Sequence, residues 1–264
     1  MAIFLAALYA FQNKLLYHPS RVSAADYAPS GTNLWIASGK QKLFASGTIL
    51  GLIADPAAGP PTAGTAIVFH GNAGHAGHRG YYVQQLNSLR MRVILAEYPG
   101  YGPRSGKPDE TVLIDDAVKL VTQAHQQHGQ PLWLIGESLG AGVVAAIAAR
   151  TPSAIRGIVL ITPWNRLVEV ASHHYPFLPV RWLLTSHYDS VSSLAEFHGP
   201  TLVIVADEDT IVPSDLGLDL YQSLDQPKRL ILIEGAGHND WTKHVGPSFW
   251  TKAMQWLQQA QTPH

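Results

Sequence analysis

Short, continuous runs of apolar residues recur along the chain from residue 65 to residue 233. Such runs are typical of parallel strands that helices cover on both faces of a sheet. The predicted strands are 65–69, 92–96, 132–135, 157–161, 201–205 and 229–233. The helices predicted between and after them are 76–89, 110–128, 139–150, 213–224 and 247–260. This alternation predicts an α/β fold with a mostly parallel, twisted sheet flanked by helices.

Two further segments change this pattern. Residues 33–37 and 43–53 have the pattern of short strands separated by Gly39-Lys40-Gln41, which brings the expected sheet to about eight strands. About 40 residues separate the predicted strands 157–161 and 201–205, far more than a crossover helix needs. We therefore expect a small helical cap over about residues 164–198. Its apolar side chains either line a substrate pocket or form the core of the cap, and the candidates are Trp164, Phe177, Leu178 and Trp182.

The amino terminus is apolar but short. Residues 1–11 carry no charge, and Phe4, Leu8, Phe11 and Leu15 recur at helical spacing. Eleven helical residues span about 16 Å, roughly half of a hydrocarbon core. We therefore expect a helix within residues 1–19 that packs on the body or on a second copy, as in a homodimer, or lies at a membrane surface. A single α/β domain that includes the cap then covers residues 20–264.

The composition excludes several classes of protein. The chain of 264 residues has a formal net charge of −1 and no basic stripe, which argues against nucleic-acid binding. It has no cysteine, so disulfides, a thiol nucleophile and cysteine-based metal centres are excluded. A hydrophobic content of 46% is typical of a chain with a large core.

The strongest motif is Gly136-Glu137-Ser138-Leu139-Gly140, which follows a predicted buried strand and begins a predicted buried helix. A sharp strand-to-helix turn of this kind exposes a serine hydroxyl in a strained conformation that small neighbours tolerate. It also leaves the Leu139 amide free at the start of the helix, where it can stabilise an oxyanion. We therefore expect Ser138 to be a nucleophile.

A serine nucleophile needs a base, and the base needs a carboxylate that fixes its tautomer. The strand at 201–205 leads into a loop with Asp207 and Asp209, and the strand at 229–233 leads into a glycine-rich loop with His238. In doubly wound folds, active groups lie at the carboxyl ends of strands. We expect His238 to be the base, and the Asp-x-x-Val-Pro spacing favours Asp209 over Asp207 as the acid.

The loop after the predicted strand 65–69 contains glycine and other small residues that can aim an amide at the reacting centre. We expect Asn72, or in second place Ala73, to supply the second oxyanion donor beside Leu139. The nearby histidines His70, His75 and His78 could instead be metal ligands, but they form no helical i,i+4 pair, and neither an HExxH motif nor a nearby carboxylate cluster supports a metal site. The sequence therefore predicts neither a metal nor a cofactor.

Together these segments resemble the α/β-hydrolase superfamily from about residue 30 onward. Within it they resemble the serine-hydrolase branch with a His-Gly-Asn-Ala-Gly loop, which includes membrane-anchored eukaryotic and bacterial acyl hydrolases. The similar segments are 70–79, 97–102, 106–110, 136–142, 162–164, 209–213 and 235–240. The resemblance implies the α/β-hydrolase fold, Ser138, Asp209 and His238 as catalytic residues, and Asn72 and Leu139 as the oxyanion hole. Arg104 departs from the family pattern, in which serine is common at this position.

The expected activity is hydrolysis of carboxylic esters with short or medium acyl chains through an acyl-enzyme. An alternative within the class is a membrane-associated lysophospholipase, monoacylglycerol lipase or acyl-protein thioesterase, with residues 1–17 contacting the membrane surface. An alternative from another class is a non-catalytic binding scaffold on the same fold. The compartment follows the same division: a cytoplasmic protein, or one held at a membrane by its apolar first helix.

Overall fold

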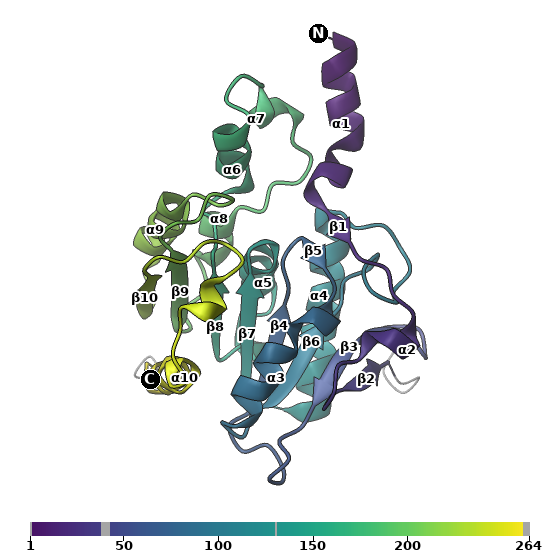
Figure 1. Cartoon of the computed structure of the whole chain (residues 1–264), viewed down its shortest axis with the longest axis vertical. Helices are drawn as coiled ribbons and strands as arrows, with labels where there is room; N and C mark the ends of the chain where they lie inside the picture. The colour runs from purple at the N-terminus through teal and green to yellow at the C-terminus, as the bar shows by residue number, and fades with distance from the viewer. Residues whose placement is uncertain (1, 38–42, 130, 261–264) are drawn as a thin grey trace.

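The computed structural model describes residues 2–37, 43–129 and 131–260. Its centre is an eight-stranded sheet in the order β10-β9-β8-β7-β4-β6-β3-β2 (Figure 1). The strands from β10 to β6 run parallel, whereas β3 is antiparallel to β6 and to β2. The strands are β2 (Asn33–Ile36), β3 (Ile49–Ala54), β4 (Thr65–Phe69), β6 (Arg92–Ala96), β7 (Leu132–Glu137), β8 (Gly157–Ile161), β9 (Thr201–Ala206) and β10 (Lys228–Ile233).

Helices cover both faces of the sheet. The α-helices are α1 (Ala2–Leu16), α2 (Ala24–Tyr27), α3 (Gly80–Asn87), α4 (Glu110–His128), α5 (Leu139–Arg150), α6 (Leu167–His174), α7 (Val180–Leu183), α8 (Ser190–Leu194), α9 (Ser214–Ser223) and α10 (Phe249–Gln259). The smaller elements are the pair β1 (His18–Pro19) and β5 (Ala73–Gly74), and the 3₁₀ helices η1 (Ala76–Arg79), η2 (Pro152–Ala154) and η3 (Trp241–Lys243).

Two apolar cores lie on opposite faces of the sheet. Helices α4, α5 and α9 contribute Leu120, Val144 and Leu220 to one core, and α3 and α10 contribute Leu86 and Leu257 to the other. Because both faces are covered, every position of β4 and β8 is buried. This burial explains the continuous apolar runs from which the strands are predicted.

The predicted elements agree with the structure with two differences. The helix predicted over 76–89 is divided into η1 and α3. The strand predicted over 43–53 is too long, because residues 43–48 form turns and bends before β3 begins at Ile49. Gly47 in this turn has a φ of 85°, which ends an extended run. The separator Gly39-Lys40-Gln41 lies outside the described residues.

The segment after β8 rises above the carboxyl ends of the parallel strands. Its helices α6 and α7 project from the body, whereas α8 packs against α5 (Figure 1). Arg166 and Asp189 close the base of the projection, because they form a β-bridge and an ion pair with 3.1 Å between Nε and Oδ2. The projection therefore has a fixed base on the sheet.

Helix α1 stands beside α7 on the same side of the molecule (Figure 1). The Gln12 side chain joins them: Nε2 donates to the Leu183 carbonyl at 2.9 Å, and Oε1 accepts from the Thr185 amide at 2.8 Å. Below the helix, the Tyr17 hydroxyl lies 3.1 Å from that of Tyr188. None of the helices in these ranges combines the length and apolar character that crossing a bilayer requires.

Candidate active site

Ser138 occupies a strained turn between β7 and α5. It has a φ of 51° and a ψ of −113°, outside the regions that L-residues ordinarily populate. β7 ends at Glu137 and α5 begins at Leu139, so the turn contains Ser138 alone. Because Leu139 is the first residue of α5, its amide has no acceptor within the helix.

Two glycines permit this turn. A Cβ at Gly136 would lie 2.3 Å from the Gly140 carbonyl oxygen, and one at Gly140 would lie 2.0 Å from the Phe69 carbonyl oxygen. Neither distance is possible for a real Cβ atom. The glycines therefore let the start of α5 approach the ends of β7 and β4.

The structure brings Asp209 to His238 and leaves Asp207 exposed. His238 Nδ1 lies 2.6 Å from Asp209 Oδ2, and the amides of Ile211 and Val212 donate to Asp209 Oδ1 at 2.9 and 2.8 Å. A carboxylate can only accept here, so Nδ1 of a neutral His238 carries the proton and Nε2 is a free base. Ser138 and His238 line the same cavity.

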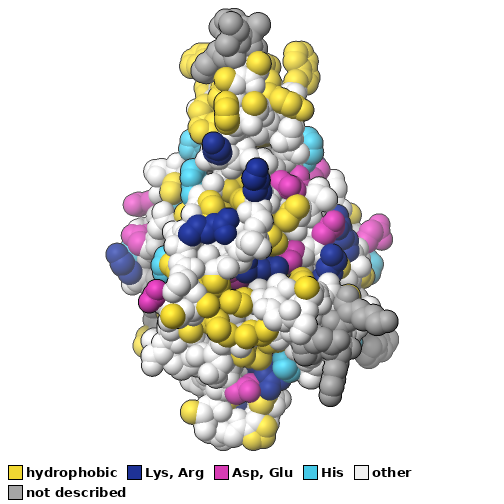
Figure 2. Space-filling model, turned by 90° about the vertical axis from the view of Figure 1, so that its right-hand side faces the viewer, with side chains coloured by type: hydrophobic (Ala, Val, Ile, Leu, Met, Phe, Trp, Pro, Cys, Tyr) yellow, Lys and Arg dark blue, Asp and Glu magenta, His cyan; other side chains and the backbone are white. Residues whose placement is uncertain are grey.

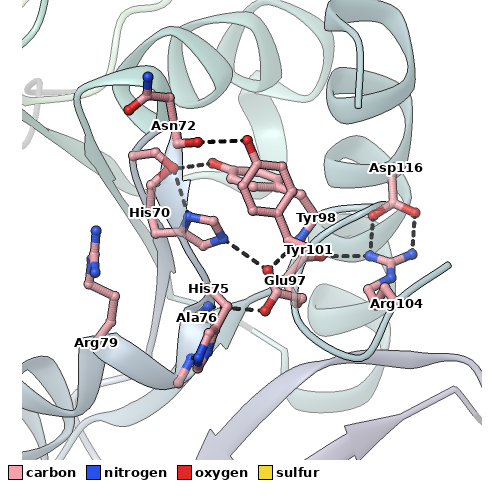
Figure 3. Close-up of polar contacts among 12 residues, drawn as sticks. His70, Asn72, His75, Ala76, Arg79, Glu97, Tyr98, Tyr101, Arg104 and Asp116 are labelled. Atoms are coloured by element: carbon pink, nitrogen blue, oxygen red, sulfur yellow. Dashed lines mark hydrogen bonds and ion pairs between the residues drawn. The ribbon is translucent and has the colours of Figure 1, made fainter. Parts of the chain in front are cut away.

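The loop from His70 to Ala76 is held by buried polar groups of the loop that follows β6 (Figure 3). The Tyr98 hydroxyl donates to the His70 carbonyl at 2.9 Å, and the Tyr101 hydroxyl donates to the Asn72 carbonyl at 2.8 Å. His70 Nδ1 lies 2.7 Å from the Gly71 carbonyl oxygen. Three successive carbonyls are thus fixed on one side.

A trans peptide directs its carbonyl and the next N–H in opposite directions. With the carbonyls of residues 70–72 held by the tyrosines and His70, the amides of Gly71, Asn72 and Ala73 are directed away from those groups. These three residues line the cavity that Ser138 also lines. The arrangement supports Asn72 and Ala73 as candidate oxyanion donors, and their role stays a prediction.

Glu97 anchors this loop from the interior. Its Oε1 lies 2.9 Å from His70 Nε2, and its Oε2 accepts from the Ala76 amide at 3.0 Å (Figure 3). Both side chains of this pair are at most 1% exposed. Burial alone would raise the pKa of the Glu97 carboxyl, but hydrogen bonds and the charge of His70 lower it below its ordinary value.

Arg104, which departs from the family pattern, supports the same region. Its two terminal nitrogens donate to both oxygens of Asp116, each at 2.7 Å, and Nη1 also donates to the Glu97 carbonyl at 2.6 Å (Figure 3). The Arg104–Asp116 pair therefore links the loop after β6 to helix α4. This residue has a structural role that its sequence position did not reveal.

The alternative of a histidine metal site receives no support in the part of the chain that the structure describes. No group of three or more histidine, aspartate or glutamate side chains there has the arrangement to hold a metal ion. His70 is bonded to Gly71 and Glu97, and His75 Nδ1 accepts from the Gly77 amide at 3.1 Å. Burial lowers the pKa of His75 and of His78, and the positive charge of Arg79 lowers both pKa values further.

Two cavities meet at Ser138. The larger has a volume of about 400 Å³ and an apolar lining, and the smaller has a volume of about 280 Å³ and a polar lining. Trp164 and Leu178 line the apolar cavity, which is the first of the two alternatives that the sequence left open for the cap. Phe177 and Trp182 fit neither alternative, because their side chains are 97% and 88% exposed and neither lines this cavity.

Helix α1 supplies an unexpected wall of the apolar cavity. Leu8, Gln12, Leu15 and Leu16 line it, whereas Phe11 of the predicted stripe is 55% exposed. The side chain of Phe4 lies outside the described residues. Of the stripe that apolar spacing predicts, Leu8 and Leu15 therefore line the cavity and Phe11 does not.

The polar cavity contains residues for which the sequence analysis predicted no function. Arg79 Nε donates to Glu137 Oε2 at 2.5 Å, and the Tyr82 hydroxyl donates to Glu137 Oε1 at 2.5 Å. All three residues line this cavity with His238. Arg79 and Glu137 both lie inside the motifs quoted above, but their pairing across 58 positions leaves no local signal.

The family described as serine aminopeptidase, S33, matches residues 60–190 of this chain. The uncharacterized protein Rv2307c of Mycobacterium tuberculosis is 35% identical over 235 residues, which cover 87% of this chain and 81% of that protein. Esterase PF2001 of Pyrococcus furiosus superposes with a TM-score of 0.66 at 18% identity, covering 92% of this chain and 98% of the esterase.

The chain belongs to the α/β-hydrolase superfamily. The predicted α/β-hydrolase fold, with its mostly parallel sheet flanked by helices, is confirmed. A further relative is the lysophosphatidylserine lipase ABHD12 of Danio rerio, which is 31% identical over 185 residues. That match covers 62% of this chain and 48% of the lipase. The protein is accordingly an α/β hydrolase.

Proposed function

We propose that this protein is a serine hydrolase that cleaves carboxylic esters through an acyl-enzyme. The observation that carries the proposal is that Asp209 holds His238 by a hydrogen bond while His238 and Ser138, which sits on a strained turn, line the same cavity. An imidazole held in one tautomer that can take the proton of a serine hydroxyl is the arrangement that activates a serine. Esterase and lipase structures of the same fold are consistent with this chemistry.

In the proposed reaction, His238 Nε2 takes the proton of Ser138 while Oγ bonds to the ester carbonyl carbon. The amides of Leu139 and Asn72, with Ala73 as the alternative, hold the resulting oxyanion. His238 then gives its proton to the departing alcohol oxygen as the carbon–oxygen bond breaks. Water, deprotonated by His238, releases the acid and regenerates Ser138.

The apolar cavity favours an aliphatic acyl group. Leu8 and Leu16 of α1 line it together with Trp164 and Leu178, so a hydrocarbon chain entering from Ser138 would lose contact with water. We infer esters with short or medium acyl chains. The same machinery also cleaves thioesters and amides, which a substrate panel distinguishes.

One observation favours a second candidate, hydrolysis at a lipid surface by a lysophospholipase, monoacylglycerol lipase or acyl-protein thioesterase. Apolar side chains gather at the projecting end of the molecule that α1 and α7 form (Figure 2). Tyr9, Phe11, Phe177 and Trp182 there are more than half exposed, on and next to the helices α1 and α7 that also supply residues to the apolar cavity. Exposed aromatic residues of this kind suit a membrane surface, and equally the contact of a homodimer.

The decisive experiment is labelling by a fluorophosphonate probe, which bonds to activated serines. We expect labelling of the native protein and none of Ser138→Ala, with Ser223→Ala, on α9, as the matched control. Esters of graded acyl length, measured with and without phosphatidylglycerol vesicles, then separate the two candidates. Folded native protein that is neither labelled nor hydrolytic would favour the binding scaffold instead.

A further inference from the structure

The two cavities differ in which catalytic group they contain. Both include Ser138 and Asn72, but His238 lines only the polar cavity. The apolar cavity is lined instead by residues such as Val212 and Trp164. The two halves of an ester bound at Ser138 therefore meet different surroundings.

The proposed function determines which half lies where. The departing alcohol oxygen must receive its proton from His238 Nε2, so the alcohol must lie on the His238 side. The acyl chain, on the other side of the carbonyl carbon, then extends into the apolar cavity. The polar cavity is accordingly the alcohol site, and its lining selects the alcohol.

Arg79 is the cation of this site, and its side chain is 24% exposed. Burial lowers the pKa of Arg79, but the adjacent Glu137 carboxylate outweighs it, so the pKa is raised and the guanidinium is charged at all relevant pH. Only Nε is engaged, with Glu137. Nη1 and Nη2 make no hydrogen bond to any described residue, which leaves their N–H groups available to a ligand.

The Glu137 carboxylate does not prevent Arg79 from binding the oxygen atoms of a ligand. Each of its oxygens already accepts from a neighbour, one from Arg79 and one from the Tyr82 hydroxyl. The other groups that line the cavity include His78, whose pKa is lowered by burial and by Arg79, and the neutral side chains of Asn239 and Thr242. Arg79 thus keeps two nitrogens without an acceptor among the described residues, whereas each oxygen of the Glu137 carboxylate already accepts one hydrogen bond.

We propose that the polar cavity, through Arg79, binds an alcohol that carries an anionic oxygen group, a phosphate or a carboxylate. The substrate class is therefore a monoacyl ester whose acyl chain is apolar and whose alcohol is charged. A guanidinium with free paired donors is suited to such groups, because it can bind two oxygens at once. Arg79 forms and breaks no covalent bond: the ester and water give the acid and the intact anionic alcohol.

The test compares esters with one acyl chain and different alcohols. The probes are the octanoyl monoesters of glycerol, of glycerol 3-phosphate and of glycerate, below their micelle concentrations. For the native protein we expect kcat/KM of at least one anionic ester to exceed that of the neutral ester about ten-fold or more, the effect of one charge-assisted contact. Comparing the ester of glycerol 3-phosphate with that of glycerate identifies which anion the site binds.

Two substitutions should move this ratio in opposite directions. Arg79→Gln should bring the ratio to one or below, because the Glu137 carboxylate then repels the anion. Glu137→Gln should raise it, because the guanidinium loses its competing partner. Arg150→Gln is the matched control, since Arg150 pairs with Asp115 on the surface and should leave the ratio unchanged.

A measurement on the native protein guards against a variant that does not fold. Glycerol 3-phosphate or glycerate should inhibit hydrolysis of octanoylglycerol competitively, at concentrations at least ten-fold below those at which glycerol inhibits. Equal rates on neutral and anionic esters, or a ratio that Arg79→Gln leaves intact, would overturn the assignment of the pocket. Absence of hydrolysis and of fluorophosphonate labelling would instead overturn the proposed function.

Discussion

The Asp209 carboxylate is fixed on both of its oxygens, and this distinguishes it from the neighbouring acids. Two backbone amides hold Oδ1, and His238 lies against Oδ2. Asp207 and Glu208 belong to the same acid-rich loop but are exposed. The Asp-x-x-Val-Pro spacing predicted this choice, because the residues two and three positions after Asp209 carry the amides that cap its side chain.

Replacing Asp209 should therefore be far more harmful than replacing Asp207. Asp209→Asn can present its amide nitrogen to Nδ1 and so reverse the histidine tautomer, which should lower kcat for a soluble ester by about ten-thousand-fold. Asp207→Asn, the matched control, should change kcat less than about two-fold. Steady-state kinetics of both variants check this, and the opposite order of losses would reassign the acid.

Glu97 should couple the stability of the protein to pH. Its pKa is lowered in the folded protein, so it stabilises the fold above its unfolded pKa, and this contribution is lost as pH falls through the folded value. Glu97→Gln should cost about 3–5 kcal/mol at pH 7, because it leaves His70 without its buried partner. The free energy of unfolding of the variant should then vary less with pH below about 4.5 than that of the native protein.

Urea unfolding at pH 7 and at acidic pH measures this difference. Asp115→Asn, which removes a surface partner of Arg150, is the control and should cost less than about 1 kcal/mol. A native protein and a Glu97→Gln variant with the same pH dependence would show that the Glu97 carboxyl does not stabilise the loop. The variant should also lose activity, since the loop directs the amides of Asn72 and Ala73.

At the scale of elements, prediction from sequence succeeded where burial imposes a pattern and failed where contacts are non-local. Strands 65–69, 92–96 and 157–161 were predicted with their observed bounds, because a strand covered on both faces must be apolar throughout. Nothing local predicts that Gln12 bonds to Leu183, and Phe177, before α7, is a large apolar residue typical of a core but is exposed. The cap and α1 were therefore predicted to exist, but not which of their faces line the cavity.

The turn at Ser138 depends on the absence of a Cβ at Gly140. Gly140→Ala should destabilise the protein by more than about 3 kcal/mol, because its Cβ would overlap the Phe69 carbonyl oxygen at 2.0 Å and force β4 and α5 apart. The matched control is Gly142→Ala on the same helix, whose Cβ would lie 3.1 Å from the Tyr188 ring, a contact that is tight but far from the overlap at Gly140. Thermal unfolding and fluorophosphonate labelling of both variants check this; equal stability losses would contradict it.

At the scale of the whole molecule, distant parts of the chain come together around Ser138 to separate the two sides of an ester. The amino-terminal helix and the cap enclose the apolar side, and the loops after β4 and β10 form the polar side (Figure 1). The end of the molecule that carries α1 and α7, which also supply residues to this cavity, has exposed apolar side chains (Figure 2). A lipid surface at this end would contact the same elements that line the acyl side.

This geometry gives the membrane candidate a sharp test. Replacing Phe177 and Trp182 with serine should reduce binding to phosphatidylglycerol vesicles, and hydrolysis of long-chain esters within them, by about ten-fold or more, because both side chains are almost fully exposed. The kcat/KM for a soluble ester should stay within about two-fold, since neither residue lines a cavity that contains Ser138. Leu232→Thr is the control, because Leu232 is 47% exposed on the edge strand β10. Vesicle sedimentation and parallel assays measure both effects, and equal losses on soluble and vesicle-bound esters would mean that these side chains support the fold of the cap and do not contact lipid.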